Sequence, residues 1–438
     1  MTEDYRPEAE VVRICQDLIR IDTTNYGPDP GPGERQAAER VAELLDEVGI
    51  SVELYESAPK RTTLIAHWEP DGVDESVPPL LVHGHLDVVP ARADDWSVPP
   101  FSGEVLDDCV WGRGAIDMKD FDAIVLSVVR ARTRAGVPPR RPVRLVFTAD
   151  EEAGSVLGGH WLVDHHPETI ADCTEAIGEV GGFSLTVRDD LRIYPIQTAE
   201  KGLAWLELVA EGRAGHGSFR NDDNAITELA TAVANVGRYE WPHRITSAQQ
   251  AFLEGVFDAF GVDLDLDQAE EILARLGSIV RMVGATMSNT ANPTMLTAGY
   301  KHNVIPGSAK AVVDGRFVPG GRDELLATID ELVGNKVRAS VSLEQPAVET
   351  EFAGALVDAI KDCLLAEDPG ARPVPFLMSG GTDAKAWARL GVRCFGFSPL
   401  RLPPELDFAG MFHGVDERVP TASLEFGARV LDRFLAVA

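Results

Sequence analysis

HGHLDVVPARADDWSVPPFSGEVLDDCVWGRGAIDMKD, residues 83–120, is the stretch around which the chain is organised. It follows an apolar run, residues 79–82, which predicts a buried strand that ends near His85 and Asp87. A metal-binding histidine needs an acceptor for its second ring nitrogen, and Asp87 offers one two residues away. About 30 residues further on, glycines on both sides of Arg113 permit a turn that brings in a second carboxylate, Asp117. The stretch therefore predicts a metal site at the end of a strand.

Composition limits the protein class. The chain has 438 residues, enough for two domains, and its 45% hydrophobic and 25% charged residues are typical of a soluble globular protein. A formal net charge of −30 argues against nucleic acid and anionic membranes as partners. The five cysteines are scattered without a CxxC pair, which suits a reducing compartment. The first ten residues are too polar for a signal peptide. No run reaches the ~20 apolar residues that span a bilayer. We therefore expect a cytoplasmic protein.

The first part of the chain alternates predicted helices and strands. Helical apolar spacing occurs over residues 7–21, 34–48, 121–135 and 155–165. Strand patterns occur over residues 51–55, 63–68, 79–82, 142–148 and 175–177. This alternation predicts an α/β domain with a mostly parallel sheet that is covered on both faces, and we assign residues 1–196 to its first part.

The pattern changes after Tyr194 and Pro195. Predicted strands over residues 202–210, 295–300, 309–317 and 340–344 mix with predicted helices over 223–236, 247–277 and 323–333, without strict alternation. This mixture predicts an inserted α+β domain over residues 197–347. Residues 348–438 then return to the α/β pattern and complete the first domain, with a strand over 393–397 and a closing helix over 421–437.

Further acidic and imidazole side chains follow predicted strand ends. Glu151 and Glu152 follow one buried strand, Glu179 follows another, and His413 lies near the end of the chain. Two histidines with several carboxylates and no cysteine suit catalytic zinc, and two ions can share one carboxylate at roughly 3.5–4 Å. Hydrolysis also needs a base beside the metal; the sequence alone leaves open which of Glu151 and Glu152 is the base and which the ligand. Taken singly, each of these residues is more often a surface carboxylate or a hydrogen-bonded histidine.

A set of motifs, in order along almost the whole chain, resembles the di-zinc metallopeptidases of family twenty in clan MH. This family includes aminoacylase-1, glutamate carboxypeptidase, acetylornithine deacetylase and succinyl-diaminopimelate desuccinylase. The motifs are HGHLDVVP, WSVPPFSG with WGRGAIDMK, TADEEAGS, IGEVGG, GRAGHGS, NVIPG, DGRFVPG, SGGTDAKAW and FHGVDE. The resemblance implies a zinc-exopeptidase-like catalytic domain interrupted by a ferredoxin-like domain for dimerisation that also acts as a lid.

The resemblance also implies roles for the cluster. One zinc ion would be held by His85, Asp117 and Glu179, and a second by Asp117, Glu152 and His413, with cobalt or manganese as possible substitutes. Asp87 would orient His85, and Glu151 would be the general base and then the acid. A cis peptide would follow Asp117.

A second group of residues would bind the substrate. The resemblance implies that His216 reaches the site of a partner subunit in a homodimer and stabilises the oxyanion. Arg316 and Asn303, with the backbone of Gly380 and Gly381, would hold a free carboxylate. Two alternatives stay open from the residues alone: Arg316 could pair with an aspartate on the surface, and His216 could be a turn residue between two glycines.

The predicted function is zinc-dependent hydrolysis of an amide or peptide bond next to a free carboxylate, by a metal-bound hydroxide with a glutamate base. The substrate would be a small molecule: a dipeptide, a peptide or an N-acyl amino acid. Acetylornithine and succinyl-diaminopimelate are alternatives, but a long segment, residues 239–292, favours the peptidase and aminoacylase branch.

Asp120 and Phe121 stand where the family often has two glycines. A silent binding protein on this scaffold is the non-enzyme alternative, although no ligand or base is missing.

Overall fold

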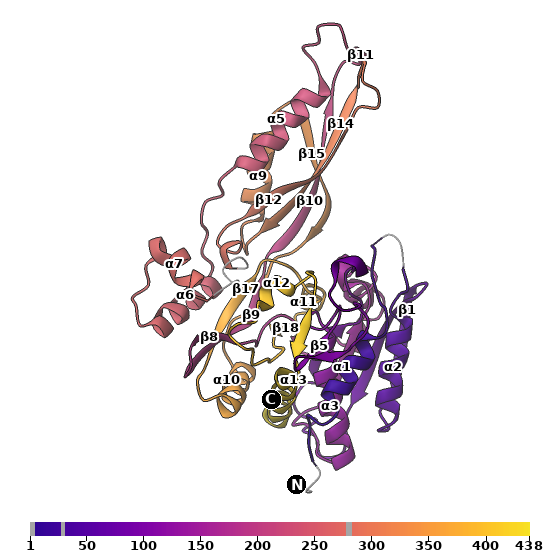
Figure 1. Cartoon of the computed structure of the whole chain (residues 1–438), viewed down its shortest axis with the longest axis vertical. Coiled ribbons are helices and arrows are strands. Elements are labelled where there is room, and N and C mark those ends of the chain that lie inside the picture. The colour runs from indigo at the N-terminus through magenta and orange to yellow at the C-terminus, as the bar shows by residue number, and fades with distance from the viewer. Residues whose placement is uncertain (1–4, 28–30, 277–282) are drawn as a thin grey trace.

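Two sheets, joined end to end, form the frame of the molecule (Figure 1). The computed structural model describes residues 5–27, 31–276 and 283–438. Residues 1–4, 28–30 and 277–282 lie outside this description. They include the last residue of the helix predicted over residues 247–277 and the first residues of the chain. The first and the last helix of the described chain both belong to the part built on the large sheet (Figure 1).

The large sheet is mixed, with parallel strands at its centre. Its strands follow the order β1 (Val52–Ala58), β2 (Arg61–Trp68), β6 (Val143–Thr148), β3 (Leu80–His85), β7 (Glu175–Gly178), β18 (Arg393–Gly396), β9 (Leu191–Glu200) and β16 (Val348–Glu349), while β8 (Leu185–Arg188) and β17 (Ala371–Met378) also pair with β9. Pairing is parallel from β6 through β3 and β7 to β18, and between β17 and β9. The remaining pairs are antiparallel. The α/β class is as predicted, but parallel pairing is confined to these strands.

Helices cover both faces of this sheet, which explains why its strands are continuously apolar. Leu80 and Val82 of β3 belong to one core cluster, and Leu81 between them belongs to another. The first cluster is completed by α1 (Val11–Ile19), α2 (Arg35–Asp46), α3 (Lys119–Ala135), α10 (Ala355–Glu367) and α13 (Thr421–Val437). The second is completed by α4 (Gly159–His165) and α11 (Ala384–Ala388).

The small sheet is antiparallel and has its own core. Its strands follow the order β12 (Thr290–Ala298), β14 (Ser308–Phe317), β10 (Gly202–Glu211) and β15 (Val337–Gln345). Two helices, α5 (Ala225–Arg238) and α9 (Arg322–Val333), pack on it and share a separate apolar cluster. At the end far from the large sheet, β11 (Gly215–His216) pairs with β13 (Val304–Ile305) (Figure 1). The chain enters this part where β9 ends and β10 begins.

Two further helices lie between the strands of the small sheet in sequence but pack elsewhere. They are α6 (Ser247–Phe260) and α7 (Ala269–Ala274). α6 packs against β17 and β9, and its apolar residues belong to the core cluster of the large sheet. We therefore propose that the inserted domain lies within residues 197–347. Two helices of this range, α6 and α7, belong to the domain of the large sheet.

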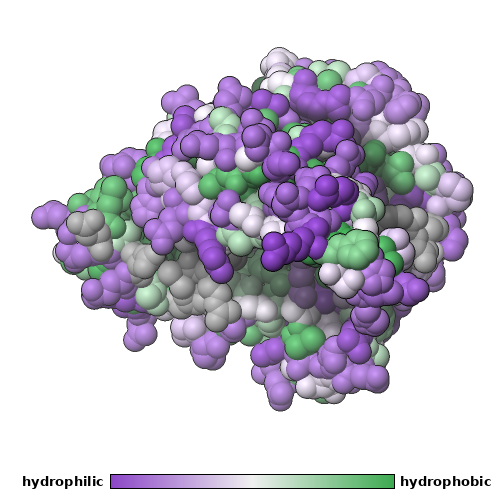
Figure 2. Space-filling model, turned by 90° about the horizontal axis from the view of Figure 1, so that it is seen from above, coloured by the Kyte–Doolittle hydropathy of each residue, from purple (hydrophilic) through white to green (hydrophobic). Residues whose placement is uncertain are grey.

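The remaining short elements bring distant segments together beside the sheet. β5 (Cys109–Trp111) pairs with β4 (Val105–Leu106) on one side and with β19 (Arg418–Pro420) on the other, and α12 (Phe408–Met411) precedes β19. Hydrophilic residues cover most of the face seen in Figure 2, with apolar residues scattered among them. None of the helices in the described part of the chain has both the length and the apolar character that a bilayer span requires.

Candidate metal centre and active site

The parallel centre of the large sheet positions the acidic and imidazole side chains. His85 is the last residue of β3, Glu151 and Glu152 follow β6, and Glu179 follows β7. These three strands are neighbours and run parallel, so their carboxyl ends meet at one edge of the sheet. Residues nearly a hundred positions apart in sequence are thus brought together.

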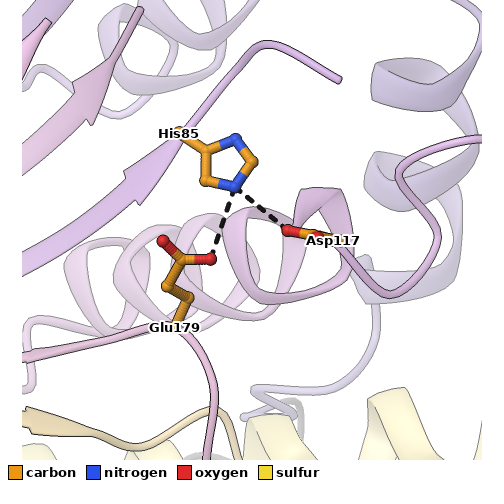
Figure 3. Close-up of side chains that lie close together, drawn as sticks. All are labelled: His85, Asp117 and Glu179. Carbon is orange, nitrogen blue, oxygen red and sulfur yellow. Dashed lines mark hydrogen bonds and ion pairs between the residues drawn. The ribbon is translucent and has the colours of Figure 1, made fainter. Parts of the chain in front are cut away.

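One group of three possible ligands consists of His85, Asp117 and Glu179. The Nε2 atom of His85 lies 3.1 Å from Oδ1 of Asp117 and 3.4 Å from Oε2 of Glu179. Figure 3 shows this ring nitrogen pointing between the two carboxylates, which come from different segments. All three residues are buried or nearly so, and the peptide bond after Asp117 is cis, as expected.

Asp117 also belongs to a second group, with Glu152 and His413. The Nε2 atom of His413 lies 3.2 Å from Oδ2 of Asp117 and 3.1 Å from Oε2 of Glu152. The two oxygens of Asp117 therefore face different histidines. Glu151 lies outside both groups, with Oε2 4.0 Å from Nε2 of His85. The geometry therefore distinguishes the two glutamates: Glu152 belongs to a ligand group and Glu151 does not. The sequence alone left this question open.

Asp87 is fully buried and holds two parts of the cluster. Its backbone carbonyl lies 3.0 Å from Nδ1 of His85, closer than its carboxylate at 3.6 Å. The carboxylate accepts the backbone N–H groups of Glu151 and Glu152, each at 3.1 Å. Asp87 thus fixes the histidine through its carbonyl and the acidic pair through its side chain.

The charges of this cluster are not balanced by the protein. Burial raises the pKa of Glu179 to about 8, and burial together with neighbouring carboxylates raises the pKa of Glu151 and Glu152. Hydrogen bonds to Asp117 and Glu152 raise the pKa of His413 to about 10. The Oε1 atom of Glu152 is buried without a hydrogen-bond partner among the described residues. An acceptor-rich set of oxygens and imidazole nitrogens with one unpartnered oxygen fits divalent cations, and zinc among them.

A cavity of about 450 Å³ opens onto both ligand groups. Its lining includes Glu151, Glu152 and Glu179 as well as Arg316, Gly380 and Gly381. Part of the wall is apolar, formed by Val180, Leu203, Trp205, Met378 and Phe412. Arg316, from β14 of the small sheet, makes two hydrogen bonds to Asp314 at 2.7 and 3.1 Å. The cavity therefore combines the candidate ligands, a guanidinium group and an apolar surface.

Two predicted residues lie far from this cavity in their own chain. His216 belongs to β11, at the remote end of the small sheet, where its Nδ1 atom lies 2.8 Å from Oγ of Ser218 (Figure 1). Asn303 precedes β13 at the same place, and its carbonyl accepts the N–H of Gly217 at 2.9 Å. The structure thus places Asn303 beside His216 instead of beside Arg316, because β13, which directly follows Asn303, pairs with β11.

Sequence reasoning missed the buried partners that support the cluster. Asn25 donates to Asp87 at 2.8 Å and accepts from Arg61 at 2.7 Å, and Arg61 also pairs with Glu34. Their charged or amide side chains occur in otherwise ordinary loop and strand patterns, so no local signal marks them.

A second support joins the two loops that carry Asp117 and His413. Arg113 pairs with Glu417 and donates to the carbonyl of Gly414 at 2.8 Å, while Glu417 accepts the N–H of Ile116 at 2.8 Å. Both residues lie inside quoted motifs, GRG and HGVDE, but only the fold brings those motifs together. The ion pair therefore fixes the loops that carry Asp117 and His413 relative to each other.

Two ligand groups that share a carboxylate at the edge of an α/β sheet form the arrangement of a metal-dependent hydrolase. The sequence matches the model of Peptidase family M20/M25/M40 over residues 81–437. The chain belongs to this family and is a hydrolase of peptide or amide bonds.

Three similar proteins illustrate the family. Aminoacylase-1 of Sus scrofa is 27% identical over 442 residues, which cover 97% of this chain and 94% of the relative. The N-fatty-acyl-amino acid synthase/hydrolase PM20D1 of Homo sapiens is 28% identical over 374 residues, 81% of this chain and 73% of the relative. The crystal structure of the M20 family metallo-carboxypeptidase Sso-CP2 from Sulfolobus solfataricus superposes with a TM-score of 0.73 at 17% identity, covering 98% of this chain and 99% of that one. This last similarity concerns the fold.

Proposed function

We propose that this hydrolase is a two-zinc enzyme that cleaves an amide or peptide bond next to a free carboxylate, with N-acyl amino acids or short peptides as substrates. The observation that carries the proposal is the cavity in which two ligand groups sharing Asp117 face Arg316. His85, Asp117 and Glu179 would hold one ion, and Asp117, Glu152 and His413 the other. When bound, the ions polarise the scissile carbonyl and lower the pKa of a water molecule.

Glu151 is the proposed general base. Glu151 lines the cavity and lies outside both ligand groups. Its backbone N–H donates to the carboxylate of Asp87, which fixes the position of Glu151. From there it takes a proton from the attacking water and returns it to the leaving amine.

Substrate binding is assigned to other residues that line the cavity. Arg316, with the backbone of Gly380 and Gly381, would hold the free carboxylate, in place of or beside Asp314. The apolar wall around Trp205 and Phe412 suits an acyl chain or an apolar side chain more than the additional charges of succinyl-diaminopimelate. The names of the relatives, aminoacylase and N-fatty-acyl-amino acid hydrolase, point in the same direction.

The site would be completed in a homodimer. His216 and Asn303 lie at the exposed end of the small sheet, so a second chain is needed to bring them to a cavity. In that position His216 would donate to the developing oxyanion.

A substrate panel tests the reaction. N-acetyl-leucine, N-octanoyl-leucine, alanyl-leucine, N-acetylornithine and N-succinyl-diaminopimelate are assayed with zinc, cobalt or manganese, and liberated amine is measured. We expect turnover of at least one leucine compound. Hydrolysis of only the ornithine or the diaminopimelate derivative would overturn the substrate assignment, and turnover of none would overturn the proposed function.

Metal removal tests the centre itself. Treatment with a chelator should abolish turnover and lower the unfolding temperature by several degrees, because bound ions stabilise only the folded state. Added zinc should restore both quantities. In the variant His413→Ala, which lacks a ligand of the second group, the chelator should lower the unfolding temperature less. An unchanged melting curve in the wild type would contradict the two-metal assignment.

A further inference from the structure

Lys385 is a buried cation directly behind the loop that lines the cavity. It belongs to α11, in the motif SGGTDAKAW, and its side chain is only 1% exposed. A Cβ atom on Gly381 would lie 2.5 Å from the Nζ atom of Lys385. Glycine at position 381 therefore allows the ammonium group to approach the loop from inside the protein.

Opposing influences act on the charge of Lys385. Its Nζ atom donates to the carbonyl of Lys201 at 2.8 Å. Burial lowers the pKa of Lys385, and the nearby carboxylate of Glu200 opposes this change. Glu200 in turn accepts from the backbone N–H of Thr382 at 3.0 Å and from its hydroxyl group at 2.6 Å. Glu200 thus holds Thr382 in place, and the Nζ atom of Lys385 is anchored to the backbone of Lys201 beside the same loop.

This cation faces the substrate side of the cavity. Gly380, Gly381 and Thr382 line the cavity together with Glu151 and Arg316. Electrostatic interactions of Lys385 extend to both of these residues. Arg316 is itself paired with Asp314, so its positive charge is partly neutralised. The ammonium group of Lys385 is therefore a further source of positive potential where a carboxylate would bind.

We infer that Lys385 is a specificity-determining residue, whose buried ammonium group behind Gly381 makes the cavity select substrates with a free carboxylate. The inference rests on the proposed function, because it concerns the subsite assigned there. Lys385 acts through the loop and the field it produces, without touching the substrate. A charge several ångströms away in a partly desolvated site changes binding about tenfold.

The test compares a substrate with its uncharged counterpart. The best leucine compound from the panel and its C-terminal carboxamide are assayed with the wild type, Lys385→Gln and Lys385→Arg. Glutamine keeps a donor for the carbonyl of Lys201 but removes the charge. We expect Lys385→Gln to raise KM for the carboxylate substrate about tenfold, with kcat and the carboxamide values nearly unchanged. Lys385→Arg should keep most of the preference.

A binding measurement makes the result independent of turnover. In the Glu151→Gln background, calorimetric titration with N-acetyl-leucine and N-acetyl-leucinamide should show the same loss of preference when Lys385→Gln is added. Equal weakening for both ligands, in either experiment, would mean that Lys385 is only a structural brace and would overturn the inference. If the wild type hydrolyses no member of the panel, the proposed function fails, and the titration still decides the role of Lys385.

Discussion

Asp87 illustrates what single residues do in this site. Its carbonyl accepts from His85 while its carboxylate fixes the backbone of Glu151 and Glu152 and accepts from Asn25. A carboxylate has room for several donors, and here they come from two separate segments, around residue 25 and around residue 151. One residue therefore aligns a candidate ligand of each group as well as the candidate base.

The two neighbouring glutamates should respond differently to the same substitution. Glu151→Gln should retain metal and lose turnover by a factor of about 10² to 10⁴, because the base is removed and the ligand groups stay intact. Glu152→Gln, the matched control with the same change of atoms, should reduce metal content. Metal analysis and kcat on both variants check this. Full activity in Glu151→Gln, or normal metal content in Glu152→Gln, would contradict the assignment.

Two elements escaped prediction because they contain proline, which removes a ladder donor and usually marks an edge or a loop. Pro195 lies in β9, and Pro373 and Pro375 lie in β17. These strands pair in parallel, with Pro195 opposite Val374 and Pro375 opposite Ile196. Both strands are largely buried, so the packing of their side chains outweighs the missing donors.

One buried arginine links α1, α2 and α3 in addition to their apolar packing. Arg130 of α3 donates to Glu10, the residue before α1, at 3.0 Å and to Glu47, the residue after α2, at 2.8 Å. Arg134 adds a bond to Glu10 at 2.7 Å. Burial raises the pKa of Glu10, but the two arginines outweigh this effect and lower it to about 2.

The stability that Glu10 contributes should depend on pH. Because its folded-state pKa is depressed, the contribution is complete above the ordinary value of 4.5 and is lost as pH falls towards about 2. Glu10→Gln should lower the free energy of unfolding by about 1 kcal/mol at pH 7, a value reduced for solvent screening. The difference from wild type should shrink between pH 4.5 and 3 in denaturant titrations.

A control separates this ion pair from ordinary surface charge. Glu39→Gln removes a carboxylate that pairs with Arg35 on an exposed helix face, at 2.8 Å. We expect a change of at most a few tenths of a kcal/mol throughout this pH range. A pH-independent effect of Glu10→Gln would show that packing and not charge is responsible.

The molecule as a whole separates its candidate functional residues into two places. The ligand groups, Glu151 and Arg316 surround one cavity, whereas His216 and Asn303 lie at the far end of the small sheet (Figure 1). The two places are parts of one extended chain. They become neighbours only if a second copy is present, as the proposed homodimer requires.

Mixing two inactive variants tests this arrangement. Subunits with His216→Ala and subunits with Glu151→Gln should each be nearly inactive. After mixing and exchange we expect about a quarter of the wild-type rate, because half of the dimers would carry one intact site of two. Mixing Glu151→Gln with the double variant His216→Ala/Glu151→Gln provides the control and should restore nothing. A mixture as inactive as its components would contradict a site shared between subunits.

Patterns of neighbouring amino acids were enough to establish the class of the protein and the candidates for its chemistry. Apolar runs that end at His85 and before Glu151 and Glu179 predict parallel strands, and the carboxyl ends of such strands share an edge. The order of the motifs was sufficient to identify the family, which the match over residues 81–437 confirms. These conclusions depend on local patterns, which neighbouring residues encode.

How these segments meet in space became known from the fold alone. It separated Glu151 from Glu152, paired Arg113 with Glu417 and placed Lys385 behind Gly381. It also packed α6 on the large sheet, although α6 lies in the inserted part of the sequence. The physical reason is that these contacts join segments separated by long stretches of chain, where distance and direction depend on the packing of whole sheets and helices. No local periodicity or motif encodes such contacts.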